Sequence, residues 1–199
     1  MKRSSSKPSN TATSSSSIEH AGASGVRVAL TGAPGTGKTT LAALLDSSFS
    51  VHAVRDLAEA CGALGPLEGD GAQGVDLNAL LQHVQRLPSD LLIEGHLSHH
   101  LNPDAIVVLR CAPEVLSHRL EVRGYDSNKV RANVEWEMLG GVHAEIQDAG
   151  LDVPVLELDA SSMSAKAMAE RVRSWSSKGF PCSNRPFIDW LADATHLPS

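Results

Sequence analysis

The sequence is poor in aromatic residues, in cysteine and in long apolar runs, and each shortage excludes a class of protein. Only 4% of its 199 residues are Phe, Trp or Tyr, which leaves few rings for stacking nucleic-acid bases. Cys61, Cys111 and Cys182 lie far apart and form neither a disulfide framework nor a zinc knuckle. No apolar run approaches the ~20 residues of a membrane span, and no secretory signal is recognisable. The sequence therefore predicts a reduced, cytoplasmic protein that does not enter a membrane.

Charge divides the chain into a basic start and an acidic body. Residues 1–24 carry a net charge of +2 and residues 25–199 carry −8, which together give the total net charge of −6. An acidic body disfavours nucleic-acid binding, and we expect no direct sequence-specific contact with nucleic acid. It is compatible with a basic protein partner, although most surface charge only maintains solubility. Residues 1–24 are mainly Ser, Thr, Asn and Ala, and predict a disordered tail before a single domain over 25–199; a transit segment is the alternative.

The rest of the chain alternates between short apolar runs and helical patterns. The runs predict five strands, at Val26–Leu30, Ser50–Val54, Leu91–Ile93, Ala105–Leu109 and Val153–Leu158. We expect the first to be buried on both faces, and the third and fourth to be buried as well. The helical patterns cover Lys38–Leu45, Leu57–Cys61, Val75–Leu87, Pro113–Val122, Ser127–Ile146 and Ser164–Trp175. We expect Ser127 to cap its helix, a kink at Gly140-Gly141, and a mobile glycine-rich loop over residues 62–74. This alternation predicts an α/β fold with a five-stranded parallel sheet covered by helices on both faces.

The strongest motif is Gly32-Ala33-Pro34-Gly35-Thr36-Gly37-Lys38-Thr39, a complete phosphate loop. It follows a predicted strand and opens a predicted helix, which is the context that this motif requires. Its glycines let backbone N–H groups face phosphates, and the helix N-terminus adds partial positive charge. Lys38 is expected to reach the β- and γ-phosphates, the Thr39 hydroxyl to ligate Mg²⁺, and Thr40 to lie near the α-phosphate. The motif predicts a binding site for ATP or another nucleoside triphosphate.

Glu94-Gly95-His96 follows the predicted strand Leu91–Ile93. Because ligands gather at the carboxyl ends of parallel strands, we expect this segment beside the phosphates. Glu94 is predicted to hold a Mg²⁺-bound water, the alternative being a solvated carboxylate. His96 is either structural or orients water or the acceptor. The adjacent His99 and His100 do not predict a zinc site, because no Cys or acid accompanies them at ligand spacing in the sequence.

Arg119 and Arg123 lie four positions apart near the end of one predicted helix, and therefore on one helix face. Phosphoryl transfer needs such cations to neutralise charge on the transferred group, so both are candidate catalytic residues. The alternative is a solvated helix end that the helix dipole favours. Gly124 after Arg123 supplies a hinge, which predicts a lid at this turn. Arg110 is a weaker candidate for a phosphate contact.

Taken together, these motifs resemble one known family, the small archaeal and eukaryotic adenylate kinase isoenzyme six. The resemblance covers about residues 26–158 and rests on Gly32–Thr40, Glu94–His96, Val107–Arg110, Arg119-Leu120, Arg123–Tyr125, Lys129-Val130, Asn133-Val134 and Glu135–Glu137. It implies a P-loop nucleoside monophosphate kinase fold, an acceptor-binding segment over about 55–78 and a short lid over about 122–132. The ATP-binding residues that it implies are Gly35, Gly37, Lys38, Thr39, Thr40 and Arg123, with Glu94 and His96 near the reacting phosphates.

In function, the resemblance implies a broad-specificity nucleoside monophosphate kinase with accompanying ATPase activity. It also implies a role in late maturation of the small ribosomal subunit, through binding of a basic ribosomal protein. Two departures stand out. Glu94 replaces the Asp of many members, and Glu59 stands where the family often has Arg, so an acceptor-phosphate contact is missing or comes from Arg55.

Three functional hypotheses follow. The first is a kinase that transfers the γ-phosphoryl group of Mg·ATP to AMP or another nucleoside monophosphate. The second is an ATP-switched ribosome assembly factor that binds a basic ribosomal protein with little kinase turnover, which the Arg-poor acceptor segment favours. The third is a kinase for another small metabolite, because phosphate loops serve many acceptors.

Overall fold

The computed structural model describes residues 25–67, 69, 73–88, 90–182 and 187–194, so the tail predicted over residues 1–24 lies outside it. Five parallel strands form the central sheet in the order β2-β5-β1-β6-β7. Their bounds are β1 Arg27–Gly32, β2 Ser50–Ala53, β5 Leu91–Glu94, β6 Ala105–Arg110 and β7 Val155–Asp159. All five predicted strands are confirmed.

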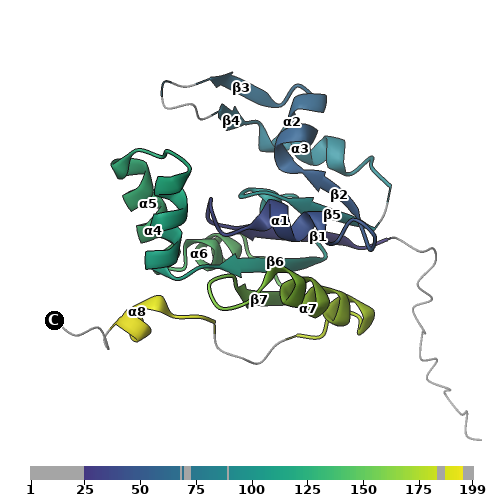
Figure 1. Ribbon diagram of the computed structural model, residues 1–199. Coiled ribbons are helices and arrows are strands. Elements are labelled where there is room, and N and C mark those ends of the chain that lie inside the picture. The colour runs from purple at the N-terminus through teal and green to yellow at the C-terminus, as the bar shows by residue number, and fades with distance from the viewer. Residues whose placement is uncertain (1–24, 68, 70–72, 89, 183–186, 195–199) are drawn as a thin grey trace, which may run out of the picture.

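Helices cover both faces of this sheet, as expected for parallel strands (Figure 1). One face packs against α1 and α7, through side chains such as Leu30, Val107, Leu41 and Val172. The other face packs against α2 and α3 in one smaller cluster and, through Ile106, against α6 in another, while a further cluster joins α4 to α5. The bounds are α1 Lys38–Ala43, α2 Val54–Ala60, α3 Leu77–Val84, α4 Pro113–Val122, α5 Ser127–Met138, α6 Gly141–Asp148 and α7 Ala165–Ser177.

The glycine-rich stretch predicted as a mobile loop contains a small antiparallel hairpin. Strands β3 (Leu64–Leu67) and β4 (Gln73–Val75) pair with each other, and Leu64 lies opposite Val75. Both of these side chains pack against the cluster under α2 and α3. A Cβ on Gly65 would lie 3.3 Å from the carbonyl oxygen of Gly74, so glycine lets the two strands approach. The loop prediction is therefore wrong for these strands, because apolar anchors outweigh the glycines.

The helix predicted from Ser127 through Ile146 is two helices, α5 and α6. Gly140 has φ +65°, a left-handed conformation that ends α5 and starts α6 at a new angle. A Cβ on Gly141 would collide with the Trp136 indole at 2.2 Å. The expected kink is thus a full break. The cap of α5 is also corrected, since the Asp126 side chain, not Ser127, accepts from the N–H groups of Asn128 and Lys129.

Two short helices were not predicted. One is a 3₁₀ turn, η1, at Ser98–His100, and the other is α8 at Trp190–Ala194. None of the helices in the described ranges is long and apolar enough to cross a membrane.

The fold gathers its functional candidates at one edge of the sheet. The carboxyl ends of β1, β5 and β2 lie together there, because these strands are parallel and adjacent. The phosphate loop follows β1, Glu94 ends β5, and α2 follows β2. Figure 1 shows α2, α3 and the β3–β4 hairpin on one side of the molecule and the α4–α5 pair on another. The carboxyl ends of these strands therefore lie between two units, one made of α2, α3 and the hairpin and the other of α4 and α5.

Candidate functional site

The phosphate loop is held in shape by its glycines and by Thr36. Gly32, Gly35 and Gly37 all have positive φ, at +137°, +90° and +101°. At Gly32 a Cβ would lie 2.3 Å from the Leu109 carbonyl oxygen, so no side chain fits there. The buried Thr36 hydroxyl donates to the Ala33 carbonyl at 2.9 Å and fastens the loop to itself. The loop therefore presents a preformed concave backbone at the start of α1.

Lys38 lies folded across this loop. Its Nζ donates to the carbonyl oxygens of Gly32 and Ala33, both at 2.9 Å, and the side chain is buried. The pKa of Lys38 is lowered to about 8, mainly by burial and to a smaller extent by the charge of Arg123, while the charge of Glu94 acts in the opposite direction. A buried ammonium at the start of a helix is suited to bind an anion such as a phosphate.

Thr39 and Glu94 meet at the mouth of the loop. The Thr39 hydroxyl donates to Glu94 Oε1 at 3.2 Å, although the two residues are 55 positions apart. The register of β1 against β5 brings them together, since Leu30 lies opposite Glu94. A hydroxyl and a carboxylate are hard oxygen ligands of the kind that Mg²⁺ prefers. This pair fits the Mg²⁺ expected at Thr39 and Glu94.

His96 lies two residues beyond Glu94, and its ring is edge-on to the Trp136 indole with 4.9 Å between centroids. Its Nδ1 is buried and has no hydrogen-bond partner within the described ranges. Burial lowers the pKa of His96, which outweighs the opposing effect of Glu145. The backbone here is fixed, because the Thr31 hydroxyl donates to the His96 carbonyl at 3.0 Å. His96 is thus a neutral imidazole with one unsatisfied nitrogen. The contact of His96 with Trp136 could not be predicted from the sequence.

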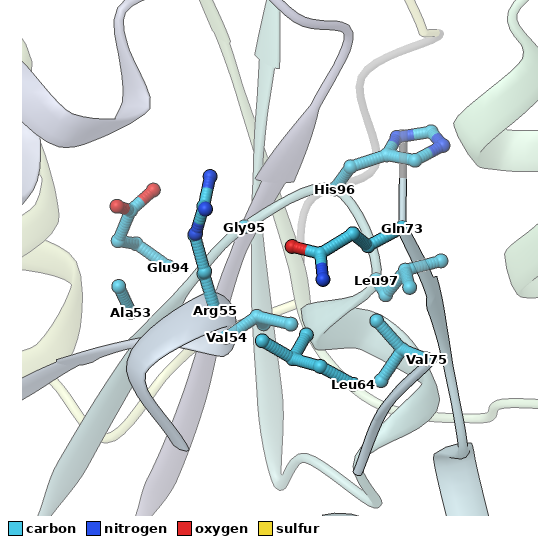
Figure 2. Close-up of a pocket in the computed structure, with 10 residues that line it drawn as sticks. All are labelled: Ala53, Val54, Arg55, Leu64, Gln73, Val75, Glu94, Gly95, His96 and Leu97. Atoms are coloured by element: carbon cyan, nitrogen blue, oxygen red, sulfur yellow. The ribbon is translucent and has the colours of Figure 1, made fainter. Parts of the chain in front are cut away.

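A pocket of about 290 Å³ opens next to Glu94, under α2 and the β3–β4 hairpin. It is lined by Ala53, Val54, Arg55, Leu64, Gln73, Val75, Glu94, Gly95, His96 and Leu97. Figure 2 shows Arg55 and Glu94 pointing toward one end of the pocket and the aliphatic side chains gathered at the other. Gln73 lies between them, and its amide also donates to the Gly65 carbonyl at 3.2 Å. The pocket is therefore charged at the end nearest the phosphate loop and apolar at the far end.

The two candidate arginines of α4 lie in different surroundings. Arg123 follows the last residue of α4 and is exposed, yet its charge acts on Lys38. Arg119 is half-buried and donates to the Ala160 carbonyl at 2.9 Å and to Cys111 Sγ at 3.5 Å. The guanidinium of Arg119 therefore ties α4 to the segment after β7, while Arg123 remains at the turn predicted as a lid.

Arg110 does not face the phosphates, so its weaker candidacy for a phosphate contact is wrong. It is buried and donates to Glu137 Oε1 at 2.7 Å and to Glu157 Oε1 at 2.8 Å. It also donates to the carbonyl oxygens of Glu137 and Ile188, both at 2.9 Å. The buried guanidinium thus joins α5, β7 and the chain just before α8. Neither acid could be assigned to Arg110 from the sequence, because each is distant along the chain.

The two adjacent histidines have an acid beside them in the fold, although none stands at ligand spacing in the sequence. Glu145 of α6 places its Oε2 atom 2.9 Å from His99 Nε2 and 3.7 Å from His100 Nε2. The sequence predicted α6 as part of a longer helix, and the spacing of its residues did not indicate that Glu145 would lie beside η1.

Comparison with known proteins agrees with this geometry. Residues 28–140 match the family described as an AAA domain. A protein of Halobacterium salinarum named "Putative adenylate kinase" is 39% identical over 152 residues, which cover 75% of this chain and 89% of that protein. A protein of Archaeoglobus fulgidus with the same name is 38% identical over 148 residues, covering 74% and 80%.

Solved structures give the same fold at low identity. Shikimate kinase from Acinetobacter baumannii, in complex with shikimate, has a TM-score of 0.57 at 13% identity, over 78% of this chain and 94% of that one. Deoxyadenosine kinase from M. mycoides, with bound dATP, has a TM-score of 0.50 at 14% identity, over 76% and 100%. These likenesses confirm the P-loop kinase fold. By its match over residues 28–140 and by its archaeal relatives, the chain belongs to the AAA-domain family of P-loop proteins, in the group named for adenylate kinase.

Proposed function

We propose that this phosphotransferase is an ATP-dependent nucleoside monophosphate kinase, which transfers the γ-phosphoryl group of Mg·ATP to AMP or a related monophosphate. The observation that carries the proposal is the position of Glu94. Its carboxylate accepts from Thr39 of the phosphate loop, and the same residue lines the pocket under α2. A donor site and an acceptor pocket that share one residue suit direct transfer between two bound phosphates.

In this proposal the phosphate loop and Lys38 bind ATP. The N–H groups at the start of α1 face the phosphates, and the ammonium of Lys38 exchanges its two loop carbonyls for phosphate oxygens. Thr39 and Glu94 would hold Mg²⁺, which neutralises phosphate charge when it is bound. Gly35, Gly37 and Thr40 complete the nucleotide-binding set by backbone or hydroxyl contact. The protein contributes mainly by positioning the two phosphates and by stabilising the negative charge on the transferred group.

The acceptor occupies the pocket with its phosphate toward Glu94 and Arg55. Arg55 is the cation that lines the pocket, and a planar guanidinium can grip two phosphate oxygens at once. The aliphatic end, with Leu64, Val75 and Leu97, accommodates the base or sugar. A monophosphate dianion attacks through its own oxygen and requires no protein base. The free Nδ1 of His96 is suited to orient that phosphate or a nearby water.

Arg123 completes the site from the α4–α5 turn. It is exposed, next to Gly124 with φ +77°, so the turn can carry it toward the phosphates. There it would stabilise charge on the transferred group, while Arg119 positions α4 through its bond to Ala160. This closure would also exclude water and limit ATP hydrolysis, which we propose as a slower accompanying activity.

A second candidate function is an ATP-switched assembly factor in small ribosomal subunit maturation, which binds a basic ribosomal protein. The net charge of −8 over residues 25–199 favours it, because an acidic body attracts a basic partner. Helix α2 borders the pocket and has Glu59 where the resembled family often has Arg, so Arg55 is the arginine that this helix offers to an acceptor phosphate. This shortage of arginine also favours the assembly factor over the kinase. A kinase for another small metabolite is the third candidate.

A coupled assay separates these candidates by comparing ATP consumption with and without each monophosphate. The kinase proposal predicts stimulation by AMP or another monophosphate of about tenfold or more over ATP alone, because the acceptor replaces water. Equal consumption with every acceptor would leave an ATPase and favour the assembly factor. Stimulation by a different small metabolite alone would favour the third candidate.

The Arg55→Ala variant tests the acceptor pocket within the same assay. Loss of its phosphate contact should raise the KM for the monophosphate by about tenfold, with the KM for ATP little changed. Arg171→Ala is the matched control, since Arg171 is an exposed arginine on α7 that does not line this pocket. An unchanged KM in Arg55→Ala would contradict the assignment of this pocket to the acceptor phosphate.

A further inference from the structure

A compact cluster of metal-ligating side chains lies outside the proposed nucleotide site. His99 and His100 of η1 and Glu145 of α6 bring their ligand atoms within 4.8 Å of one another. The two imidazole rings are 4.0 Å apart, and Glu145 Oε2 lies 2.9 Å from His99 Nε2 and 3.7 Å from His100 Nε2. Two imidazoles and a carboxylate are a ligand set that zinc takes in proteins.

Thr31 lies against the inner side of the His99 ring. Its hydroxyl oxygen is 3.0 Å from His99 Nδ1 and 3.0 Å from the His96 carbonyl oxygen. In the tautomer with hydrogen on Nδ1, His99 donates to this hydroxyl, the hydroxyl donates to the carbonyl, and Nε2 keeps a lone pair directed toward Glu145 Oε2 at 2.9 Å. In that tautomer a cation between Nε2 and Oε2 satisfies both atoms.

The surroundings of His99 are those of a metal-binding histidine. Its ring is fully buried, so its position is fixed by packing. A ligating histidine typically donates its other ring N–H to a neighbouring oxygen, and the Thr31 hydroxyl is placed to be that neighbour.

The distances and exposure suit a metal with an open side. Ligand atoms about 2.1 Å from a tetrahedral Zn²⁺ are separated by about 3.4 Å, between the two distances that Glu145 makes. Side-chain exposure rises from 0% at His99 to 27% at His100 and 34% at Glu145. The partly exposed side chains of His100 and Glu145 can adjust to the ion, and water can fill the fourth coordination position.

We infer that His99, His100 and Glu145 form a zinc site that fastens η1 to α6, separate from the magnesium site at Thr39 and Glu94. Its neutral nitrogen ligands favour Zn²⁺ over the hard cation Mg²⁺. The site would fix the loop that follows Glu94 and His96, since η1 begins two residues after His96. This inference goes beyond the proposed kinase function and does not depend on it.

The test is zinc binding by untagged full-length protein, stripped with chelator and titrated with ZnCl₂ without nucleotide. Millimolar Mg²⁺ is present throughout to occupy the oxygen ligands at Thr39 and Glu94. Isothermal titration should give one zinc ion per chain. His100→Ala and Glu145→Gln should each weaken zinc binding at least about tenfold, while His118→Ala, an exposed histidine on α4, should bind like the wild type.

Thermal melting supplies a second readout that does not rely on one variant. At a zinc concentration a hundred times the Kd, the melting temperature of the wild type should rise by about 5 °C or more. The rise should be lost in Glu145→Gln, whose fold is checked by its melt without zinc. Absence of zinc binding in the wild type, or equal affinity in wild type and both ligand variants, would overturn the inference and leave a proton between His99 and Glu145.

Discussion

Thr39 Oγ1 donates to Glu94 Oε1 across 3.2 Å, and this bond joins the phosphate loop to the pocket under α2. The two residues lie at the ends of adjacent parallel strands, so the sheet itself sets their separation. Both atoms are oxygens, and neither is fully buried. This arrangement can exchange its direct hydrogen bond for a shared Mg²⁺ when nucleotide binds.

The first prediction concerns this shared metal. Glu94→Gln keeps the size of the side chain but removes its charge, so it should weaken Mg²⁺ retention in the ATP complex. We expect turnover to fall about 10²-fold at low Mg²⁺ and to recover partly as Mg²⁺ is raised. The measurement is the Mg²⁺ dependence of kcat at saturating ATP.

Glu94→Asp is the control, because it keeps the charge and shortens the side chain by one methylene. It should need less Mg²⁺ than Glu94→Gln. If the Gln variant has the Mg²⁺ dependence of the wild type, Glu94 is a solvated carboxylate and the metal role is wrong.

Lys38→Ala tests whether the buried lysine serves a phosphate or the fold. The ammonium is buried at an energetic cost, so its removal should leave the melting temperature of the nucleotide-free protein within a few degrees of the wild type. Turnover should fall by about 10³-fold, because the β- and γ-phosphates lose their cation. A large drop in the nucleotide-free melting temperature would instead make Lys38 a structural residue of the loop.

The pH dependence of ATP binding follows from the same residue. The pKa of Lys38 in the free protein is about 8, and phosphate oxygens should raise it in the complex. ATP therefore prefers the protonated lysine, and its affinity should be level at pH 7 and fall by up to about tenfold per unit above pH 8. Lys38→Arg stays charged over this range, so its affinity should change much less with pH. Calorimetric Kd values from pH 7 to 10 provide the comparison.

The sequence predicted the framework of this protein because its signals are local. Short runs rich in apolar residues predicted all five sheet strands, and the spacing from Gly32 to Thr39 predicted the loop whose glycines have positive φ. The failures also have local causes. The glycines of 62–74 predicted a loop where Leu64 and Val75 hold a hairpin, and Gly140-Gly141 predicted a kink where the left-handed Gly140 ends the helix.

The long-range pairings could not be predicted in this way. Arg110 resembled a phosphate contact because it ends a strand, yet its partners Glu137 and Glu157 come from α5 and β7. Glu145 reaches His99 from another helix, and Trp136 reaches His96 in the same manner. Such pairs depend on how the helices pack against one another, and this packing cannot be derived from a single sequence.

Arg110→Ala should act on stability and leave nucleotide binding intact. The substitution leaves Glu137, which is 1% exposed, as a buried carboxylate without its cation. Breaking such a pair costs about 3–5 kcal/mol, so the melting temperature should fall by about 10 °C. ATP affinity measured well below that temperature should match the wild type. A stable variant with weakened ATP affinity would return Arg110 to the phosphate site.

The last prediction separates the two arginines of α4. Arg123 is exposed beside the hinge Gly124, whereas Arg119 is committed to the Ala160 carbonyl. If the turn closes only around bound nucleotide, Arg123 should act mainly in the transition state, where the transferred group redistributes its charge. Arg123→Ala should then lower kcat by about 10²-fold and weaken apparent ATP affinity much less. Arg123→Lys should recover only part of this, because an ammonium lacks the planar fork.

Two further variants decide how this result is interpreted. Arg119→Ala should lower the melting temperature by several degrees and change kcat little, because it removes a bond that holds α4. Arg131→Ala should resemble the wild type, since Arg131 is 71% exposed and contacts Glu135 only at 3.9 Å. A normal kcat with a raised KM for ATP in Arg123→Ala would make Arg123 a uniform binder. A kcat defect in Arg131→Ala instead would move the lid from the α4–α5 turn to the body of α5, because Arg131 lies one turn inside that helix.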